Sequence, residues 1–232
     1  YSARPGGYNG GTPNRRFETI LFKSGIGIWR TAAERERGRP LLRPPPERKT
    51  PMLEEFLSLL CGRFNNAAQA AEQQALDPNF PLAAHCNTAC NDKIAHLPAG
   101  FAGVFVVEES TYTANGKTHA SPHLFLFTEE GDGIRLTSYE IPAGYDKDTF
   151  TYAAMGRVEY ADLVPSKKFT PALYRREGNA WVGGSTSWFT PVLKFTLWER
   201  FSPDGLEVSE TMELNGKRTF GFDQPLLYRR ID

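Results

Sequence analysis

Two acidic side chains on an otherwise apolar strand face are the residues best suited to chemistry in this sequence. Glu199 and Glu210 lie in alternating apolar runs on either side of the turn sequence Pro203-Asp204-Gly205. If Phe201 pairs with Leu206 across that turn, alternation puts both glutamates on one face, as diagonal neighbours. The other residues of this face are Leu193, Phe195, Leu197, Phe201, Leu206, Val208, Met212 and Leu214.

A carboxylate on an apolar face is costly unless a cation or a hydrogen-bond donor meets it. The sequence leaves two interpretations open. In the first, arginines from other strands pair with the two acids. In the second, the acids line a ligand cavity and meet a cationic or N–H-rich ligand. The arginines considered for the first interpretation are Arg175, Arg176, Arg229 and Arg230.

Further candidates for ligand contacts are acids at a strand end and aromatic residues that offer stacking surfaces. The segment Glu108-Glu109 with Tyr112 shortly after it forms a second acidic point. The predicted ligand-binding residues are Glu199, Glu210, Glu108, Glu109, Tyr112, His123, Tyr139, Tyr174, Trp198, Arg175 and Tyr228.

The stretch His85-Cys86-(x3)-Cys90-(x)-Asp92-(x3)-His96 contains metal-ligating residue types. If it is helical, Cys86 and Cys90 lie one turn apart on one face, a geometry that soft metals accept. Zinc sites more usually have two residues between their cysteines, so we expect small buried residues with surface histidines and no metal. The sequence also has no phosphate-binding glycine loop, no G-x-S-x-G, no H-E-x-x-H and no dinucleotide fingerprint. No catalytic residue is identified, so ligand binding is the class of function that the sequence predicts.

The elements that must position these residues are mostly strands. After Pro98, runs rich in β-branched and aromatic residues alternate with tight turns. The sequence predicts a mainly β fold, an antiparallel meander closing into a calyx-like barrel of about ten strands. The turn signals are Asn115-Gly116, Gly131-Asp132-Gly133, Gly178-Asn179, Pro203-Asp204-Gly205 and Asn215-Gly216.

An N-terminal helical segment is expected to pack outside this barrel. Apolar residues recur at helical spacing from Leu53 to Phe64, and Asp77-Pro78 ends the pattern. Residues 81–98 are ambiguous between a short helix and a loop, and we interpret them as weakly helical. Residues 52–232 thus form the helix and β-barrel domain, and Met52 is a plausible natural start.

Residues 1–51 differ in composition from the rest. They hold nine Arg and two Lys against four Glu, whereas residues 52–232 hold 16 basic and 23 acidic residues. This Arg-, Pro- and Gly-rich segment has no sustained hydrophobic period, so we expect a disordered tail.

The whole chain has 27 Lys and Arg and 27 Asp and Glu, so its formal net charge is zero. We therefore expect no nucleic-acid partner. Three cysteines favour reduced thiols in the cytoplasm, and no apolar run approaches the length of a membrane helix, so no membrane partner is expected.

The segment Gly62-Arg63-Phe64-Asn65-Asn66-Ala67-Ala68-Gln69 resembles the G-x-F-x-N-x-x-Q signature of the CpcT/CpeT family, the T-type chromophore lyases of phycobiliproteins. Glu108-Glu109 followed by Tyr112 resembles the acidic segment of that family. Ser121-Pro122-His123-Leu124 resembles its Pro-led strand. The resemblance extends over residues 52–232.

The resemblance implies a calyx that holds an open-chain tetrapyrrole (bilin) and delivers it to a cysteine of a partner protein. Such a lyase acts by orientation and proton supply, because the reacting thiolate belongs to the acceptor. It needs no cofactor beyond the bilin as ligand, and a homodimer is compatible with it. The alternative is a non-enzymatic calyx for another small hydrophobic or tetrapyrrole ligand. Where the family has Pro-Tyr-Arg, this chain has Pro122-His123-Leu124, which favours the alternative.

Overall fold

Successive hairpins build most of the structure. In the computed structural model, which describes residues 51–146 and 148–232, each of the five predicted turns joins two antiparallel strands. Asn115 and Asn215 have φ values of 52°, as the mirror-image hairpin turn requires of its first residue. The strands of these hairpins are β4 (Val104–Ala114), β5 (Lys117–Glu130), β6 (Gly133–Tyr139), β8 (Ala172–Glu177), β9 (Ala180–Thr190), β10 (Leu193–Ser202), β11 (Gly205–Leu214) and β12 (Lys217–Phe220).

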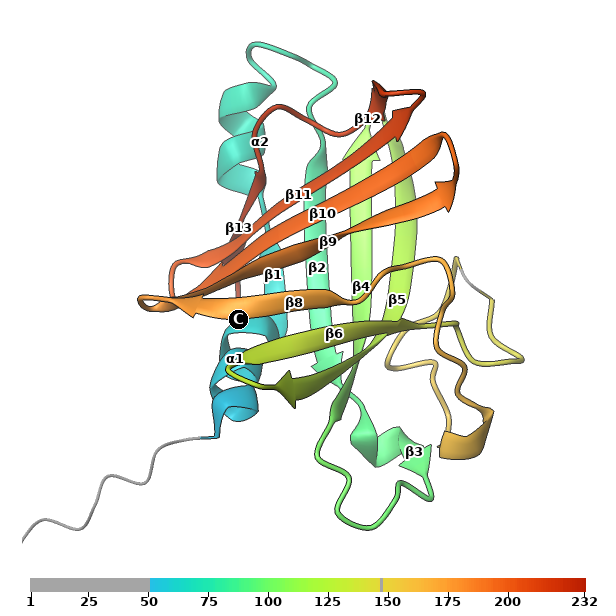
Figure 1. The fold of residues 1–232 in the computed structure, drawn as a ribbon. Coiled ribbons are helices and arrows are strands. Elements are labelled where there is room, and N and C mark those ends of the chain that lie inside the picture. Colours follow the sequence, from blue (N-terminus) through green and yellow to red (C-terminus); the bar gives the residue numbers. More distant parts are fainter. Residues whose placement is uncertain (1–50, 147) are drawn as a thin grey trace, which may run out of the picture. The chain divides into compact units, whose positions relative to one another are not determined.

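Ten strands close into an antiparallel barrel (Figure 1). The sheet runs in the order β10-β9-β8-β6-β5-β4-β2-β1-β13-β11, and pairing of β10 with β11 closes it. Strand β12 adds to the edge of β11. The predicted fold class is therefore confirmed. The remaining strands are β1 (Gly62–Asn65), β2 (Leu82–Ala89) and β13 (Leu226–Arg230), with β3 (Ile94–Ala95) and β7 (Val158–Glu159) in a separate parallel pair.

The register predicted for β10 and β11 is confirmed. Phe201 pairs with Leu206, Glu199 with Val208, and Leu197 with Glu210. Both glutamates therefore point to the interior with their apolar neighbours. A shift by one residue would place the apolar side chains of both strands in solvent, and this cost fixes the register.

The expected helical segment is interrupted by a strand. α1 (Met52–Leu60) and α2 (Ala67–Gln73) flank β1, which pairs with β2 and β13. Gly62 has a φ of +138°, a conformation that L side chains rarely adopt, so the chain can leave the helical path there. Phe64, part of the helical pattern in the sequence, is 1% exposed as a strand residue facing the core.

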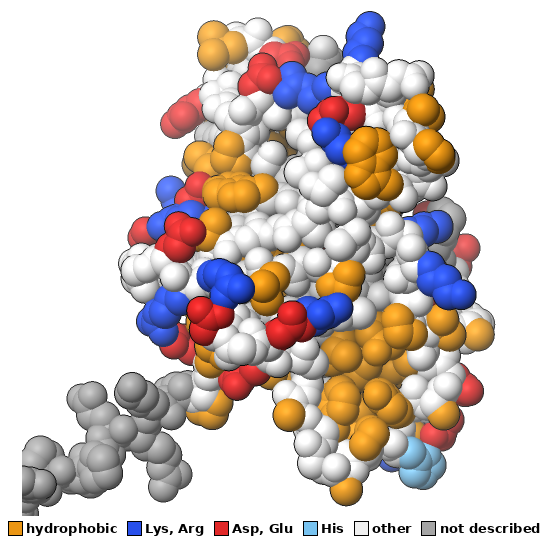
Figure 2. Space-filling model, in the orientation of Figure 1, with side chains coloured by type: hydrophobic (Ala, Val, Ile, Leu, Met, Phe, Trp, Pro, Cys, Tyr) orange, Lys and Arg blue, Asp and Glu red, His pale blue; other side chains and the backbone are white. Residues whose placement is uncertain are grey.

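Helix α1 covers one end of the barrel (Figure 1). Its Phe56 is completely buried, and its ring lies 5.2 Å from that of Phe201 and 5.3 Å from that of Phe127. A second apolar cluster lies outside the barrel, around Phe105, Phe150 and the loops that follow β6. The largest apolar area in Figure 2 lies below the barrel, over the loops beside β3.

The weakly helical interpretation of residues 81–98 is wrong. Leu82–Ala89 is strand β2, between β1 and β4, and only a single 3-10 turn, Asn91–Lys93, follows it. Alternate burial of Ala83, His85 and Asn87 is the pattern of a strand with one face inward. The prediction for residues 1–51 lies outside the described residues, apart from Pro51. No helix of the described part is long and apolar enough to cross a membrane.

Candidate functional site

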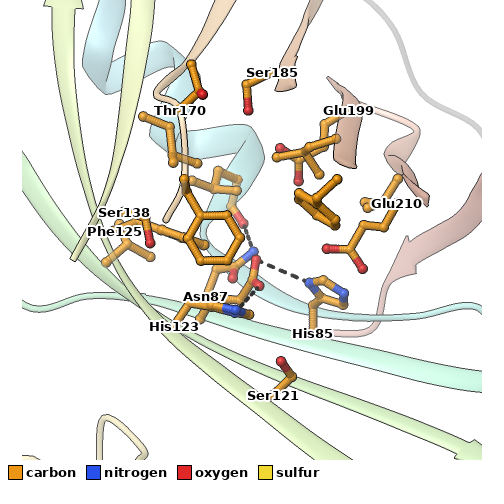
Figure 3. A pocket seen from close by; sticks show the side chains of 18 of the residues that line it. His85, Asn87, Ser121, His123, Phe125, Ser138, Thr170, Ser185, Glu199 and Glu210 are labelled. Atoms are coloured by element: carbon orange, nitrogen blue, oxygen red, sulfur yellow. Dashed lines mark hydrogen bonds and ion pairs between the residues drawn. The ribbon is translucent and has the colours of Figure 1, made fainter. Parts of the chain in front are cut away.

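A cavity of about 320 Å3 lies inside the barrel, at the lower end of the roughly 300–1,000 Å3 of small-molecule pockets. Leu60 of α1 lines the closed end, and exposed Thr170 and Phe220 lie at the open end, the mouth. Figure 3 shows polar side chains projecting into this space. Its apolar lining consists of Leu60, Val106, Phe125, Phe127, Leu136, Phe169, Phe189, Phe195, Leu197, Phe201, Val208, Met212 and Phe220.

Glu199 enters the cavity from β10 and is 8% exposed. Tyr174, fully buried on β8, donates its hydroxyl hydrogen to Glu199 Oε2. Burial raises the pKa of Glu199 to about 8, and the negative charge of Glu108 acts in the same direction. Glu199 therefore keeps its proton at neutral pH, and a neutral carboxyl group can donate one hydrogen bond while accepting others.

Glu210 reaches the same cavity from β11. The hydroxyl group of Tyr112, on β4, donates a hydrogen bond of 3.3 Å to Glu210 Oε2. Burial raises the pKa of Glu210, and the charge of Glu108 adds to this shift. Figure 3 shows Glu199 and Glu210 on the same side of the cavity.

Two histidines flank a third acid. His85 Nδ1 lies 3.4 Å from Glu108 Oε2, and His123 Nδ1 lies 3.4 Å from Glu108 Oε1. Ser110 also donates to Glu108, at 2.9 Å, and the hydroxyl group of Tyr228 lies 3.0 Å from His85 Nε2.

Burial and charge act in opposite directions in this cluster. Burial opposes the charged form of His85 and His123, but the Glu108 carboxylate outweighs it and raises the pKa of both. Burial likewise opposes ionisation of Glu108, yet the two histidines hold its pKa well below its usual range. The cluster is therefore a compensated group of charges, unlike Glu199 and Glu210.

The four arginines considered as partners of Glu199 and Glu210 are bound elsewhere. Arg175 and Arg176 form ion pairs with acids outside the cavity, and Arg229 and Arg230 donate to backbone carbonyl oxygens. In the described ranges, no lysine or arginine lines the cavity. The interpretation of arginine-paired interior acids is therefore wrong, and the interpretation that both acids line a cavity agrees with the structure.

Seven of the eleven predicted site residues lie at or directly behind the cavity wall. Tyr139 instead lines a smaller hollow beside the mouth. Glu109, Arg175 and Trp198 point outward because each is the chain neighbour of an inward residue, and successive strand side chains face opposite sides. Glu109 accepts a hydrogen bond from the Tyr152 backbone, and Trp198 is 37% exposed. The seven are Glu108, Tyr112, His123, Glu199 and Glu210 in the lining, with Tyr174 and Tyr228 behind it.

The residues of the stretch from His85 to His96 do not converge. Strand β2 points His85 inward and Cys86 outward, while Cys90 is buried in the outer cluster. His96 Nδ1 lies 2.6 Å from Glu159 Oε2 on the surface. Over residues 51–146 and 148–232, no group of three or more His, Cys, Asp or Glu side chains could hold a metal ion.

Sequence reasoning missed several polar residues of the lining. Asn87 donates from Nδ2 to the Leu60 carbonyl oxygen at 3.1 Å, while its buried Oδ1 has no hydrogen-bond partner in the described part of the chain. The alternation of small and polar residues in Leu82–Ala89 was the available signal, which the helical interpretation concealed. The missed polar residues are His85, Asn87, Ser121, Ser138, Thr170 and Ser185.

No protein-family model matches this chain, and no curated protein matches it. Fold and cavity together define a β-barrel that can hold a ligand. The aromatic lining suits a flat apolar ligand. Glu199, Glu210 and Asn87 offer acceptors for hydrogen bonds from such a ligand.

Proposed function

We propose that the barrel binds an open-chain tetrapyrrole and presents it to a cysteine of a partner protein. The pyrrole N–H groups of such a ligand converge on one edge of a flat conjugated system. Glu199, Glu210 and Asn87 Oδ1 would accept from these groups, and the phenylalanines of the lining would contact the ring faces. The family resemblance of the Gly62–Gln69 segment points to the same ligand.

The observation that carries this proposal is the pair of interior carboxyl groups without cationic partners. A buried acid with a raised pKa destabilises the folded state at higher pH unless a ligand compensates it. A tetrapyrrole can do so in two ways, by donating N–H hydrogen bonds or by taking the proton of Glu199 on a ring nitrogen and pairing with the resulting carboxylate.

In the delivery step, the thiol of the partner loses its proton to solvent and adds as the thiolate across a carbon–carbon double bond of the ligand. The S–C bond forms at one carbon, the other carbon gains a proton, and the double bond is consumed. The barrel contributes orientation and a proton source, since Glu199 lines the cavity in its protonated form. The nucleophile belongs to the partner.

A second candidate function is non-enzymatic binding of a smaller apolar ligand. The cavity volume of about 320 Å3 favours it, because an elongated four-ring ligand would extend through the mouth. The lining also has no lysine or arginine within the described residues to pair with the propionate groups of a tetrapyrrole.

Titration of the purified protein with biliverdin, followed by visible absorption, tests the proposal. We expect a shifted and sharpened band with one ligand bound per chain. Glu199→Gln and Glu210→Gln should each weaken binding by about tenfold, because glutamine cannot pass a proton to a ring nitrogen and then pair with it as a carboxylate. Glu207→Gln, on the outward face of β11 in an ion pair with Arg200, is the matched control.

The tetrapyrrole assignment would be refuted if biliverdin did not bind. It would also be refuted if the unmodified chain and the three variants bound biliverdin equally. Delivery is tested by mixing the loaded protein with a chromophore-free phycobiliprotein subunit and denaturing the mixture. A bilin that stays covalently on the subunit supports the lyase function. Tight binding without transfer supports the non-enzymatic calyx.

A further inference from the structure

Two neighbouring hairpin tips at the mouth of the barrel expose large apolar side chains. The turn between β9 and β10 contacts the turn between β11 and β12, because Asn215 N donates to Val192 O at 2.8 Å. Figure 2 shows apolar side chains at this end of the molecule. The exposed residues, called here the tip surface, are Trp188 at 61%, Val192 at 45%, Leu214 at 44% and Phe220 at 48%.

Cations accompany this surface. Lys194 lies 6.0 Å from the centre of the Trp188 ring and forms an ion pair of 2.9 Å with Glu213. Arg218 is paired with Asp223 at 2.6 Å. Lys117 and Lys217, each directly after an Asn-Gly turn, are exposed and form no ion pair within the described residues. Four cations thus lie at the end of the barrel that carries the tip surface, and two of them, Lys117 and Lys217, have no acidic partner in the described part of the chain.

The size and shape of the tip surface favour a lipid surface over a protein partner. Full aromatic side chains cover about 150–250 Å2, so these four partly exposed side chains present on the order of 400 Å2. A stable protein interface buries about 800 Å2 on each partner. Protruding tips with a tryptophan and lysines suit shallow insertion between lipid headgroups, where the bilayer interface is apolar on one side and anionic on the other.

We infer that the tip surface docks on an anionic lipid surface and directs the mouth of the cavity toward it. Phe220 belongs both to the tip surface and to the cavity lining, so the docked barrel gives an apolar ligand a continuous apolar path between membrane and cavity. This contact is peripheral and needs no membrane-spanning helix. It does not depend on the identity of the ligand.

Flotation of the purified full chain with lipid vesicles tests the inference without any ligand. We expect binding to vesicles of phosphatidylcholine and phosphatidylserine at a ratio of about 7:3, weaker binding at high salt, and little binding to phosphatidylcholine alone. The variant W188S/V192S should bind at least about tenfold more weakly, because it removes the burial of two large apolar groups. Lys217→Gln should weaken binding about fivefold, the effect of one surface cation.

Ile231→Ser is the matched control, since Ile231 is 52% exposed next to β1 at the end of the barrel covered by α1. This variant should bind like the unmodified chain. Absence of flotation, or equal flotation of all variants with retained circular dichroism, would overturn the inference. A concentration-dependent dimer that W188S/V192S abolishes would also overturn it, because the tip surface would then be an interface between two copies.

Discussion

The charge state of Glu199 follows from where β10 places it. One position further along β10 the side chain points outward, as Arg200 does in its ion pair with Glu207 of β11. Inside the barrel, burial and the negative charge of Glu108 outweigh the hydrogen bond from Tyr174, which favours the carboxylate, so the neutral acid is the stable form of Glu199. A side chain that is neutral at pH 7 and charged above pH 8 therefore lines the cavity.

This protonation makes the stability of the protein depend on pH. Between pH 5 and 8, the unfolded chain has released the proton of Glu199 while the folded chain retains it, so rising pH favours unfolding. We expect the melting temperature to fall over this range. The melting temperature of the Glu199→Gln variant should fall less. The difference in the free energy of unfolding between the two proteins should grow by up to about 1.4 kcal/mol per pH unit. His85 and Glu210 add to the decline in the unmodified chain and in the variant alike. Equal slopes of melting temperature against pH in the two proteins would contradict the prediction.

The cysteines give a second test at the scale of residues. Burial raises the pKa of the Cys61 thiol to about 11 and that of Cys90 to about 12, so both are protonated at neutral pH. Cys86 points away from the cavity. Replacing all three by alanine should leave biliverdin binding unchanged, at a cost of about 1–3 kcal/mol in stability from the cavity left at Cys90. Loss of binding in a folded variant would assign one thiol a direct role.

At the scale of elements, the residues that carry the family resemblance have structural roles. Phe64 is buried in the core beneath the guanidinium of Arg230, 4.6 Å from the ring centre. Asn66 donates to Pro81 O at 3.0 Å and accepts from Ala83 N at 2.7 Å, which anchors β2. Gln69 holds β13 through Pro225 O and Leu227 N. The segment therefore fastens two strands of the barrel to α2. This structural role does not depend on which ligand the barrel binds.

Gln69→Ala should accordingly destabilise the protein by about 1–3 kcal/mol, because the Leu227 N–H of β13 and the carbonyl oxygen of Pro225, just before β13, lose their partner. Gln73→Ala, on the same helix and without a side-chain hydrogen bond among the described residues, should change stability by less than about 0.5 kcal/mol. Chemical denaturation of both variants checks this. Equal changes in the free energy of unfolding for the two variants would show that the Gln69 hydrogen bonds contribute nothing to stability.

The elements were predictable where apolar alternation and turn chemistry agree. In β10 and β11, both signals gave the same register and placed Glu199 and Glu210 inside. In Leu82–Ala89, short alanines and polar residues replace large apolar ones, so no apolar alternation marks the strand that pairs with β1 and β4, and the weaker alternation of small and polar residues was the remaining signal. His85 and Asn87 were missed as lining residues for this reason.

At the scale of the whole molecule, the barrel closes on itself through β10 and β11, and α1 completes its core with Phe56. We expect residues 51–232 to fold without the preceding segment, with the same melting temperature and biliverdin affinity as the full chain. Limited proteolysis followed by mass spectrometry and calorimetry checks this. A fragment that unfolds would show that residues 1–50 contribute to the core.

The covered end also determines how one bound molecule can replace another. Since α1 blocks one end of the barrel, ligands enter and leave through the mouth alone. An incoming molecule therefore cannot displace a bound one from the opposite end. Exchange must then wait for the occupant to leave. In a stopped-flow chase, the observed exchange rate should reach a plateau that is independent of competitor concentration, whereas a linear rise would indicate a second way in.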